Sequence, residues 1–569
     1  MRLLRVNLSS GTVKTDLLPE QYRMLGGRGL TSTLINEMVP PDCDPMGRDN
    51  LLIFAPGLLC GTPMVNTGRL SIGAKSPLTG GIKEANSGGT MAVALARLGF
   101  RAVIFEGQAV TGNRFNLVIN AEGNASLEDA KQYKGLQNYE LAKKLFERYG
   151  PKIAVSCTGP AGEMGLKSAS IQVTDPEGRP CRSAARGGLG AVMGAKGLKA
   201  VVVSTQGNAL LQISNPDRLK QIAKQFASDI RRDGWSGDVL PKFGTASILA
   251  NTNASGALPT QNASQGTFEG ADKIDGDALF KRISKRGGKT THKGCSNCVI
   301  HCSNIYKSDS GQTMTSALEY ETIWAMGAMT CIDDLDAIAA LDFLCDDLGL
   351  DTMNTGTAIA VAMDAGVFDF GDHRAAIAAV ESIIEKAELG LLIGNGPDAV
   401  AAHFNHDQVP TVKGQSIAGY DPRAMPGMGV TYATSPMGAD HTAGFVGGAQ
   451  GSTHQLMQMS RSSQVHMAAL DSTGLCMFAQ SGGIDAVCEA VSAMTGNAFG
   501  GREWQAMGES ILLAETAFNQ ASGLGPDQDR LPRLFHNDAL GPFHGVVPYP
   551  EKGLHEMFDP VRKRVKDNK

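Results

Sequence analysis

The sequence predicts an α+β protein in which a sheet-rich N-terminal domain is followed by two mainly α-helical domains. Its 569 residues, 42% of them hydrophobic, exceed what one core normally supports, so several domains are expected. Residues 1–208 alternate short apolar runs with turns, whereas apolar residues beyond them recur at three- and four-residue spacing. We therefore place the domains at residues 1–208, 209–410 and 411–569.

The N-terminal domain opens on a predicted β-hairpin, because "LLRVNLSSGTVKTDLL" (residues 3–18) carries apolar residues on both sides of "SSG". Two later runs, "AVIFEG" (102–107) and "KAVVVSTQG" (199–207), predict buried strands. Between them and the hairpin, "GTMAVALARLGF" (89–100) predicts a short helix that ends at Gly99. The domain is therefore mixed in composition and rich in sheet.

The helical part begins where Ser214 or Asn215 can cap a helix that has Pro216 in its first turn. A second boundary, near residue 410, precedes the Gly- and Met-rich segment 419–444. The helical period predicts four further helices, within residues 333–351, 355–368, 373–390 and 503–520.

The charge balance argues against nucleic acid as a partner. Lys and Arg total 52 and Asp and Glu total 57, for a formal charge of -5, and no long basic run occurs. The sequence contains no stretch of about 18 uninterrupted apolar residues, so it predicts no membrane span. The N-terminal "MRLLRVNLSSG" lacks the apolar segment of a secretion signal, so we expect a cytoplasmic protein.

Eleven unevenly spaced cysteines do not suit a disulfide framework, and three of them fall within "GCSNCVIHCSN" (294–304). Cys295, Cys298 and Cys302 could bind zinc or an iron-sulfur cluster, because thiolates serve both. A zinc ribbon would show a second C-x2-C pair, and His301 is sterically awkward beside Cys302 as a fourth zinc ligand. Three clustered cysteines with a remote fourth are typical of a [4Fe-4S] cluster, although spacing alone leaves zinc open.

A repeated D-x-x-G-L-[DC] pattern occurs as "DDLGLD" (346–351) and "DSTGLC" (471–476), each at the end of a predicted helix. The Gly can close the helix in a left-handed conformation, and the carboxylates can accept paired N–H bonds from an aminopyrimidine edge. Cys476 ends the second copy and is the candidate for the remote cysteine. Taken singly, each copy also fits an ordinary Gly-capped helix end.

Taken together, these motifs resemble the aldehyde ferredoxin oxidoreductase family. The glycine-rich segments 26–30 ("GGRGL"), 66–89 and 186–201 are similar to pterin-facing segments of that family. The resemblance covers nearly the whole chain. It implies a tungsten (or molybdenum) bis-pterin cofactor, one [4Fe-4S] cluster, and Mg2+ bridging the pterin phosphates. It also implies that the N-terminal domain binds pterin and that the cofactor lies at the interface with the helical domains.

Residue by residue, the resemblance implies a set of ligands. Arg69 matches an arginine between cluster and pterin, and the backbone of Asn86 matches a contributor to the Mg2+ site. The implied cluster ligands are Cys295, Cys298, Cys302 and Cys476. The implied pterin-binding residues are Arg69, Asn86, Arg186, Gly187, Asp346, Gly349, Leu350, Asp351, Asp471, Gly474 and Leu475.

Two residues match the reacting groups of the family, namely Glu321 in "EYET" and His441 in "GADHTAG". Without this resemblance, the sequence is equally compatible with Glu321 being a carboxylate on a helix surface and His441 being a structural loop histidine. With it, they imply an enzyme that oxidises aldehydes to carboxylic acids and passes electrons to a ferredoxin or ferredoxin-like subunit. The sequence holds no second ferredoxin-type cysteine pattern and no convincing nucleotide motif, so the electrons are expected to leave to another protein.

Several alternatives stay open at this stage. The same cofactors could serve another substrate, such as an aromatic thioester, or a non-catalytic iron-sulfur electron-transfer protein could keep a degenerate pterin site. A zinc-binding nicotinamide dehydrogenase is disfavoured by the remote Cys476 and the failed nucleotide motif. Cys331, ten residues after Glu321, is either a further thiol near the metal or a structural cysteine. The E-x-x-H pattern of a metal at a dimer interface does not occur in the sequence, while a homo-oligomer through other contacts remains open.

Overall fold

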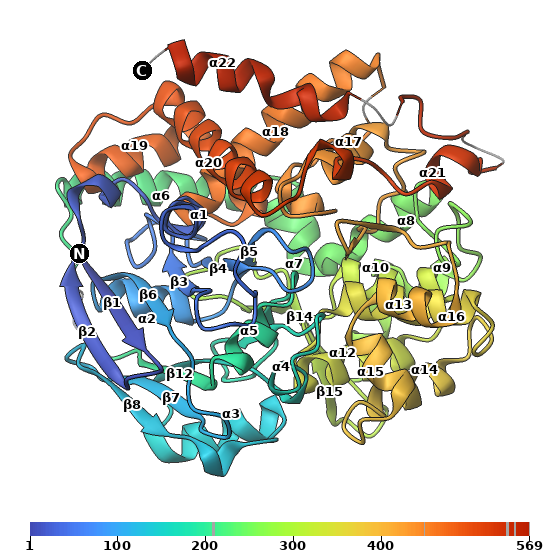
Figure 1. Ribbon diagram of the computed structural model, residues 1–569, viewed down its shortest axis with the longest axis horizontal. Coiled ribbons are helices and arrows are strands. Elements are labelled where there is room, and N and C mark those ends of the chain that lie inside the picture. The colour runs from blue at the N-terminus through green and yellow to red at the C-terminus, as the bar shows by residue number, and fades with distance from the viewer. Residues whose placement is uncertain (208–210, 449, 542–544, 551–552, 568–569) are drawn as a thin grey trace.

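A computed structural model describes residues 1–207, 211–448, 450–541, 545–550 and 553–567. Figure 1 shows the sheets of the N-terminal part on one side, with helices of the later chain beside and above them. The predicted α+β class is confirmed, because strands dominate before residue 205 and helices dominate after Pro216. The exact domain limits stay a prediction.

Two six-stranded sheets build the N-terminal part. Their strand orders are β2-β1-β6-β3-β4-β5 and β11-β10-β9-β12-β7-β8. The first sheet contains β1 (Arg2–Asn7), β2 (Thr12–Leu17), β3 (Leu52–Pro56), β4 (Leu70–Lys75), β5 (Ile82–Ser87) and β6 (Phe100–Glu106). The second contains β7 (Phe115–Ile119), β8 (Ala125–Asp129), β9 (Ile153–Cys157), β10 (Ile171–Val173), β11 (Arg182–Ala184) and β12 (Leu198–Ser204). Their helices are α1 (Gly27–Met38), α2 (Met91–Arg97), α3 (Asn138–Tyr149), α4 (Pro160–Glu163) and α5 (Leu189–Ala195).

The predicted hairpin is confirmed: β1 pairs antiparallel with β2, in a register that sets Val6 opposite Val13. The two apolar runs form β6 and β12, which lie inside their sheets and are almost wholly buried, as their unbroken apolar character requires. The predicted short helix is α2, and the chain turns at Gly99, whose φ is 77°.

Helices make up most of the remaining chain. The first group is α6 (Pro216–Arg232), α7 (Leu240–Phe243), α8 (Ile248–Ala254), α9 (Ala271–Ile274), α10 (Gly276–Lys285), α11 (Tyr320–Met326), α12 (Leu335–Leu348), α13 (Thr352–Asp364), α14 (His373–Glu381), α15 (Glu388–Gly394) and α16 (Pro397–Phe404). The second group is α17 (Pro426–Thr434), α18 (Thr453–Thr473), α19 (Ile484–Thr495), α20 (Gly501–Ala521), α21 (Leu534–Asn537) and α22 (Asp559–Asp567). Short strands accompany them: β13 (Lys289–His292), β14 (Ser303–Lys307), β15 (Thr313–Ser316), β16 (Thr411–Val412) and β17 (Gln415–Ser416).

Most predicted helices are confirmed, and one prediction is wrong. The Asn215 side chain, not that of Ser214, caps α6 by accepting a hydrogen bond from the Arg218 N–H at 3.1 Å. The single helix predicted over 373–390 is two helices, because the chain turns after Glu381 and Lys386 takes a φ of 59°. Apolar spacing persists across this turn, so periodicity alone does not reveal it. No helix in the described ranges is long and apolar enough to cross a membrane.

A buried ion cluster joins α1 to the C-terminal helices α18 and α20. Arg28 on α1 donates two hydrogen bonds to Glu515 on α20, at 2.9 and 2.8 Å, and lies 3.4 Å from Asp471 on α18. The Arg28 and Glu515 side chains are 1% and 0% exposed, so neither charge can be solvated without the other. The Ser32 hydroxyl donates a further hydrogen bond to Glu515 at 2.8 Å. This cluster fixes the second D-x-x-G-L segment against the N-terminal domain.

We predict that Arg28→Met lowers the free energy of unfolding by about 3–5 kcal/mol, because Glu515 and Asp471 lose their buried counter-charge. The matched control is Arg23→Ala, whose exposed partner Glu20 lies 3.3 Å away. That variant should lose about 0–1 kcal/mol. Denaturant unfolding of the two purified variants measures the difference, and equal losses would contradict a structural role for the buried cluster.

Candidate functional site

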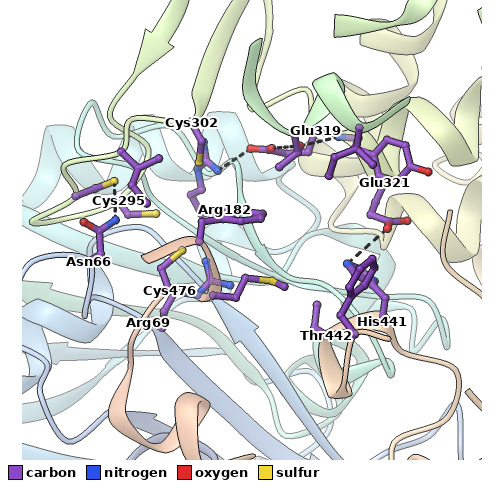
Figure 2. A pocket seen from close by; sticks show the side chains of 18 of the residues that line it. Asn66, Arg69, Arg182, Cys295, Cys302, Glu319, Glu321, His441, Thr442 and Cys476 are labelled. Carbon is purple, nitrogen blue, oxygen red and sulfur yellow. Dashed lines mark hydrogen bonds and ion pairs between the residues drawn. The ribbon is translucent and has the colours of Figure 1, made fainter. Parts of the chain in front are cut away.

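A cavity of about 470 Å³ lies where the sheet-rich part meets the later helices. Figure 2 shows its walls, with cysteines at one end and a Glu321–His441 pair at the other. Its walls are formed by Asn66, Gly68, Arg69, Arg182, Trp235, Thr245, Ile248, Cys295, Ser296, Cys298, Ile300, Cys302, Glu319, Tyr320, Glu321, Tyr420, His441, Thr442, Phe445, Cys476, Met477 and Phe478. Segments from all three predicted domains therefore meet around it.

All four cysteines predicted as cluster ligands open onto this cavity. Cys295, Cys298 and Cys302 lie on the loop between β13 and β14, and Cys476 follows the end of α18. Burial raises the pKa of the Cys476 thiol to about 11, while Arg69 opposes this effect, so a bound metal would be needed to hold the thiolate. Within the described ranges, no three His, Cys, Asp or Glu side chains are close enough to share one metal ion.

The backbone of the loop before β4 brings the two cysteine segments together. The Asn66 N–H donates to the Asn297 carbonyl at 2.9 Å, and the Asn66 carbonyl accepts from the Cys476 N–H at 2.8 Å. On the other side, a Cβ at Gly88 would stand 2.4 Å from the Cys295 sulfur, so a larger residue there would displace that sulfur. Cysteines that are more than 170 residues apart in sequence thus share one wall.

The first D-x-x-G-L segment borders a second, smaller cavity of about 190 Å³. Asp346 and Leu350 line it, and Arg69, Arg182 and Glu319 line both cavities. Burial raises the pKa of the Asp346 carboxyl well above its ordinary value, with nearby Asp342 adding to the effect. A buried carboxyl beside this cavity is suited to accept N–H bonds from a heterocycle.

The rest of that segment holds its place through local hydrogen bonds. Gly349 ends α12 with a φ of 78°, which is the left-handed cap expected from the sequence. The Asp351 carboxylate caps α13 by accepting from the Met353 N–H at 3.0 Å, and its other oxygen lies 3.6 Å from Arg186 Nε. Arg186 also donates to the Ala439 carbonyl at 2.8 Å.

The second D-x-x-G-L segment has the same geometry, since Gly474 ends α18 with a φ of 80°. Burial raises the pKa of the Asp471 carboxyl to about 8, with Glu84 adding to the effect and Arg28 and Arg69 opposing it. Arg69 also donates to the side chain and the backbone carbonyl of Asn86. Some predicted cofactor residues do not line either cavity, namely Asn86, Arg186, Gly187, Gly349, Asp351, Asp471, Gly474 and Leu475.

Glu321 and His441 face each other, with His441 Nε2 3.5 Å from Glu321 Oε1. Glu321 lies in the first turn of α11, and its other oxygen accepts from the Gly419 N–H at 2.9 Å. Burial raises the pKa of the Glu321 carboxyl, against the lowering effects of His441, the Gly419 N–H and Arg186, while Asp440 adds to the rise. A cavity-facing carboxyl with a raised pKa is suited to act as a general acid or base.

Buried polar atoms without hydrogen bonds mark where a bound group would fit. Among the described residues that line the larger cavity, no hydrogen-bond partner is present for Arg182 Nε, Glu321 Oε1 or His441 Nδ1. Native proteins rarely leave such atoms unsatisfied, so these positions are consistent with contacts to a ligand. The donor set agrees, because thiols suit iron and guanidinium and carboxyl groups suit a phosphorylated pterin. The residues present therefore fit the expected cofactors.

Sequence reasoning missed several residues of the site. Arg182 and Glu319 line both cavities, and Arg182 Nη1 lies 3.3 Å from Glu319 Oε1. Only their closeness in sequence to recognised motifs could have indicated them: Arg182 precedes the glycine-rich segment 186–201 by four residues, and Glu319 is the first residue of "EYET". Trp235 and Phe445 also line the larger cavity and carried no sequence signal.

Two weaker candidates, Cys331 and His301, do not line either cavity. The ring of His301 lies 2.9 Å from the Cys298 carbonyl oxygen, where its Nε2–H can donate, rather than among the thiols. The roles assigned to the other residues stay predictions.

Comparison with known proteins extends this picture. The sequence profile described as aldehyde ferredoxin oxidoreductase, N-terminal domain, matches residues 3–205, and that of domains 2 and 3 matches residues 221–563. The chain is 32% identical to the tungsten-containing aldehyde ferredoxin oxidoreductase of Pyrococcus furiosus, over 96% of this chain and 93% of that protein.

Two further similarities are more distant. The WOR-like subunit of aliphatic sulfonate oxidoreductase from Pyrococcus furiosus is 24% identical over 96% of this chain and 91% of that protein. The solved active-site complex BamBC of benzoyl coenzyme A reductase with 1,5-dienoyl-CoA has a TM-score of 0.81 at 20% identity, covering 99% of this chain and 94% of that chain. The latter likeness concerns the fold alone. The profiles and the 32% identity show that the chain is an oxidoreductase of the aldehyde ferredoxin oxidoreductase family.

Proposed function

We propose that this protein oxidises aldehydes to carboxylic acids and passes the electrons singly to a ferredoxin or ferredoxin-like protein. The observation that carries the proposal is that a partly buried Glu–His pair and four cysteine thiols open onto one cavity. Similarity to tungsten-containing aldehyde ferredoxin oxidoreductases supports the choice of reaction.

The proposed cofactors are a tungsten (or molybdenum) bis-pterin, Mg2+ at its phosphates and one [4Fe-4S] cluster. Cys295, Cys298, Cys302 and Cys476 would hold the cluster, and the two D-x-x-G-L segments would hold the pterins. When bound, the metal supplies two-electron redox chemistry and the cluster supplies one-electron transfer.

The chain's own residues would handle the protons and orient the substrate. Oxidation of an aldehyde by water yields the acid, two electrons and two protons, so the attacking water must lose a proton. Glu321 can accept it, because its carboxyl is buried, has a raised pKa and faces the cavity. His441, 3.5 Å away, can donate a hydrogen bond to the aldehyde oxygen from the same side.

The walls around the Glu321–His441 pair suit an aldehyde with an apolar, ring-sized substituent. Five of the residues that form the larger cavity are aromatic, whereas aromatic residues make up 6% of the chain. Trp235 and Phe445 are 39% and 41% exposed, which places them at the open side of the cavity. Phe445 packs edge-on against Tyr420 at a centroid distance of 5.0 Å.

An aromatic thioester is the second candidate substrate, because the same aromatic wall would suit its acyl group. Activity toward benzaldehyde and toward benzoyl thioesters, measured with a viologen dye as electron carrier, separates the two. Turnover of the thioester alone would overturn the aldehyde proposal.

We predict that Glu321→Gln lowers kcat for aldehyde oxidation by at least about 10²-fold, because general-base catalysis contributes roughly that much or more. Metal analysis of the anaerobically purified protein should still find about four iron and about one tungsten or molybdenum per chain. The control is Glu388→Gln, in an exposed pair with His403 at 3.9 Å. Zinc alone in the wild-type protein, or near-normal turnover by Glu321→Gln, would refute the assignment.

The pH profile should follow the charge around Glu321. A base acts as the carboxylate, so activity is lost as pH falls through its pKa, and the burial that raises this pKa places the loss above the ordinary glutamate value. In His441→Asn, the charge that lowers the Glu321 pKa is removed. The acid limb of the kcat/KM profile should therefore move to higher pH, independently of any change in the maximal rate. In contrast, His403→Asn should leave the limb in place; an unmoved limb in His441→Asn would exclude Glu321 as the titrating base.

We expect Trp235→Ala and Phe445→Ala to lower kcat/KM for benzaldehyde by roughly two- to tenfold, because each removes an aromatic contact worth about 0.5–1.5 kcal/mol. The same variants should change kcat/KM for acetaldehyde little. Phe404→Ala serves as the control, since Phe404 is 37% exposed and lines neither cavity. Equal losses for both aldehydes would exclude a role for these rings in selecting the substrate.

A further inference from the structure

Asn66 lies between the two cysteine-bearing segments of the site. It belongs to the loop that precedes β4, the residue is 4% exposed, and its φ is 58°. Asparagine tolerates this left-handed conformation better than most residues with a side chain. The backbone here is therefore held in a rare conformation at the point where the two segments meet.

Every polar group of Asn66 makes a hydrogen bond to one of these segments. Its N–H donates to the Asn297 carbonyl at 2.9 Å, and its carbonyl accepts from the Cys476 N–H at 2.8 Å. The side-chain Oδ1 accepts from the Val299 N–H at 3.1 Å. The side-chain Nδ2 donates to the Cys298 sulfur at 3.3 Å. One residue thus contacts both sources of thiols through its backbone and its side chain.

The bond to sulfur distinguishes Asn66 from its neighbours. Among the described residues, no other side chain donates a hydrogen bond to the sulfur of Cys295, Cys298, Cys302 or Cys476. Cys298 also accepts from the His301 backbone N–H, at 3.4 Å. Hydrogen bonds to cluster sulfurs are one of the means by which proteins set the reduction potential of an iron-sulfur cluster.

We propose that Asn66 is a positioning residue for the cluster, which aligns the two cysteine segments and raises the reduction potential by donating a hydrogen bond to Cys298. The reduced cluster carries one more negative charge, so an N–H aimed at its thiolate favours the reduced form. This inference rests on the proposed assignment of the four cysteines to a [4Fe-4S] cluster.

The test is a potentiometric titration of the anaerobically purified protein, followed by EPR, together with iron analysis. Asn66→Gly keeps the backbone conformation and removes the donor, whereas Asn66→Asp keeps the shape and turns a carboxylate oxygen toward the sulfur. The potential should fall in Asn66→Gly and fall further in Asn66→Asp. The control is Asn297→Asp, which adds the same charge at an exposed position of the cysteine loop; its side chain bonds to the Met64 carbonyl at 2.8 Å and not to a sulfur.

The outcomes separate this inference from the proposed function. Wild-type protein without iron would overturn the cluster assignment itself. Wild-type iron content with an unchanged potential in Asn66→Gly, or equal shifts in Asn66→Asp and Asn297→Asp, would overturn the role of Asn66 alone. If only Asn66→Asp loses iron, the reduction potential of Asn66→Gly decides whether the hydrogen bond to Cys298 raises the potential. If both Asn66 variants lose iron while Asn297→Asp keeps it, the result supports the role of Asn66 in aligning the two cysteine segments.

Discussion

The site depends on backbone contact between two segments that lie some 400 residues apart in the chain. The N–H groups of Leu58 and Leu59 donate to the carbonyls of Ser472 and Thr473, each at 2.9 Å. A Cβ at Gly57 would stand 2.1 Å from the backbone nitrogen of Gly474, so the two chains can approach this closely only because Gly57 has none. This contact places the second D-x-x-G-L segment, and hence Cys476, beside the N-terminal domain. The glycine-rich composition of the segments is therefore a requirement of packing as well as of ligand access.

Close backbone contact brings charged groups into the interior, and each of these needs compensation. Arg28 is matched by Glu515 and Asp471, as described above, and Lys83 forms a 3.0 Å ion pair with Asp440. Burial acts to raise the pKa of Asp440, but Lys83 and neighbouring cations lower it well below the ordinary range, so Asp440 stays ionised beside His441. The ion pairs thus keep Asp440 charged, whereas the raised pKa of Glu321 favours uptake of a proton.

Much of the fold followed from local patterns, because hairpins, helix caps and apolar periodicity are properties of short segments. The left-handed caps at Gly349 and Gly474 could be predicted for that reason. The break after Glu381 could not, because apolar spacing continues through it. Arg182 and Trp235 escaped detection for a different reason: their place in the site depends on which distant segments fold around them. Resemblance, rather than spacing, was needed to single out Glu321, whose burial becomes visible only in three dimensions.

The two ends of the larger cavity differ in charge in a way that suits their proposed tasks. In Figure 2, Arg182 stands between the cysteine end and the Glu321–His441 pair, whereas Arg69 lies beside Cys476; both arginines line the two cavities. Guanidinium groups at the cysteine end favour thiolates and an anionic cluster, since the interior screens their charge weakly. At the other end, the aromatic wall lowers the polarity around Glu321 and so favours its neutral form. If the cysteine end takes up electrons and Glu321 takes up a proton, as proposed, the surroundings of each end favour the form that results: an anionic cluster at one end and a neutral carboxyl at the other.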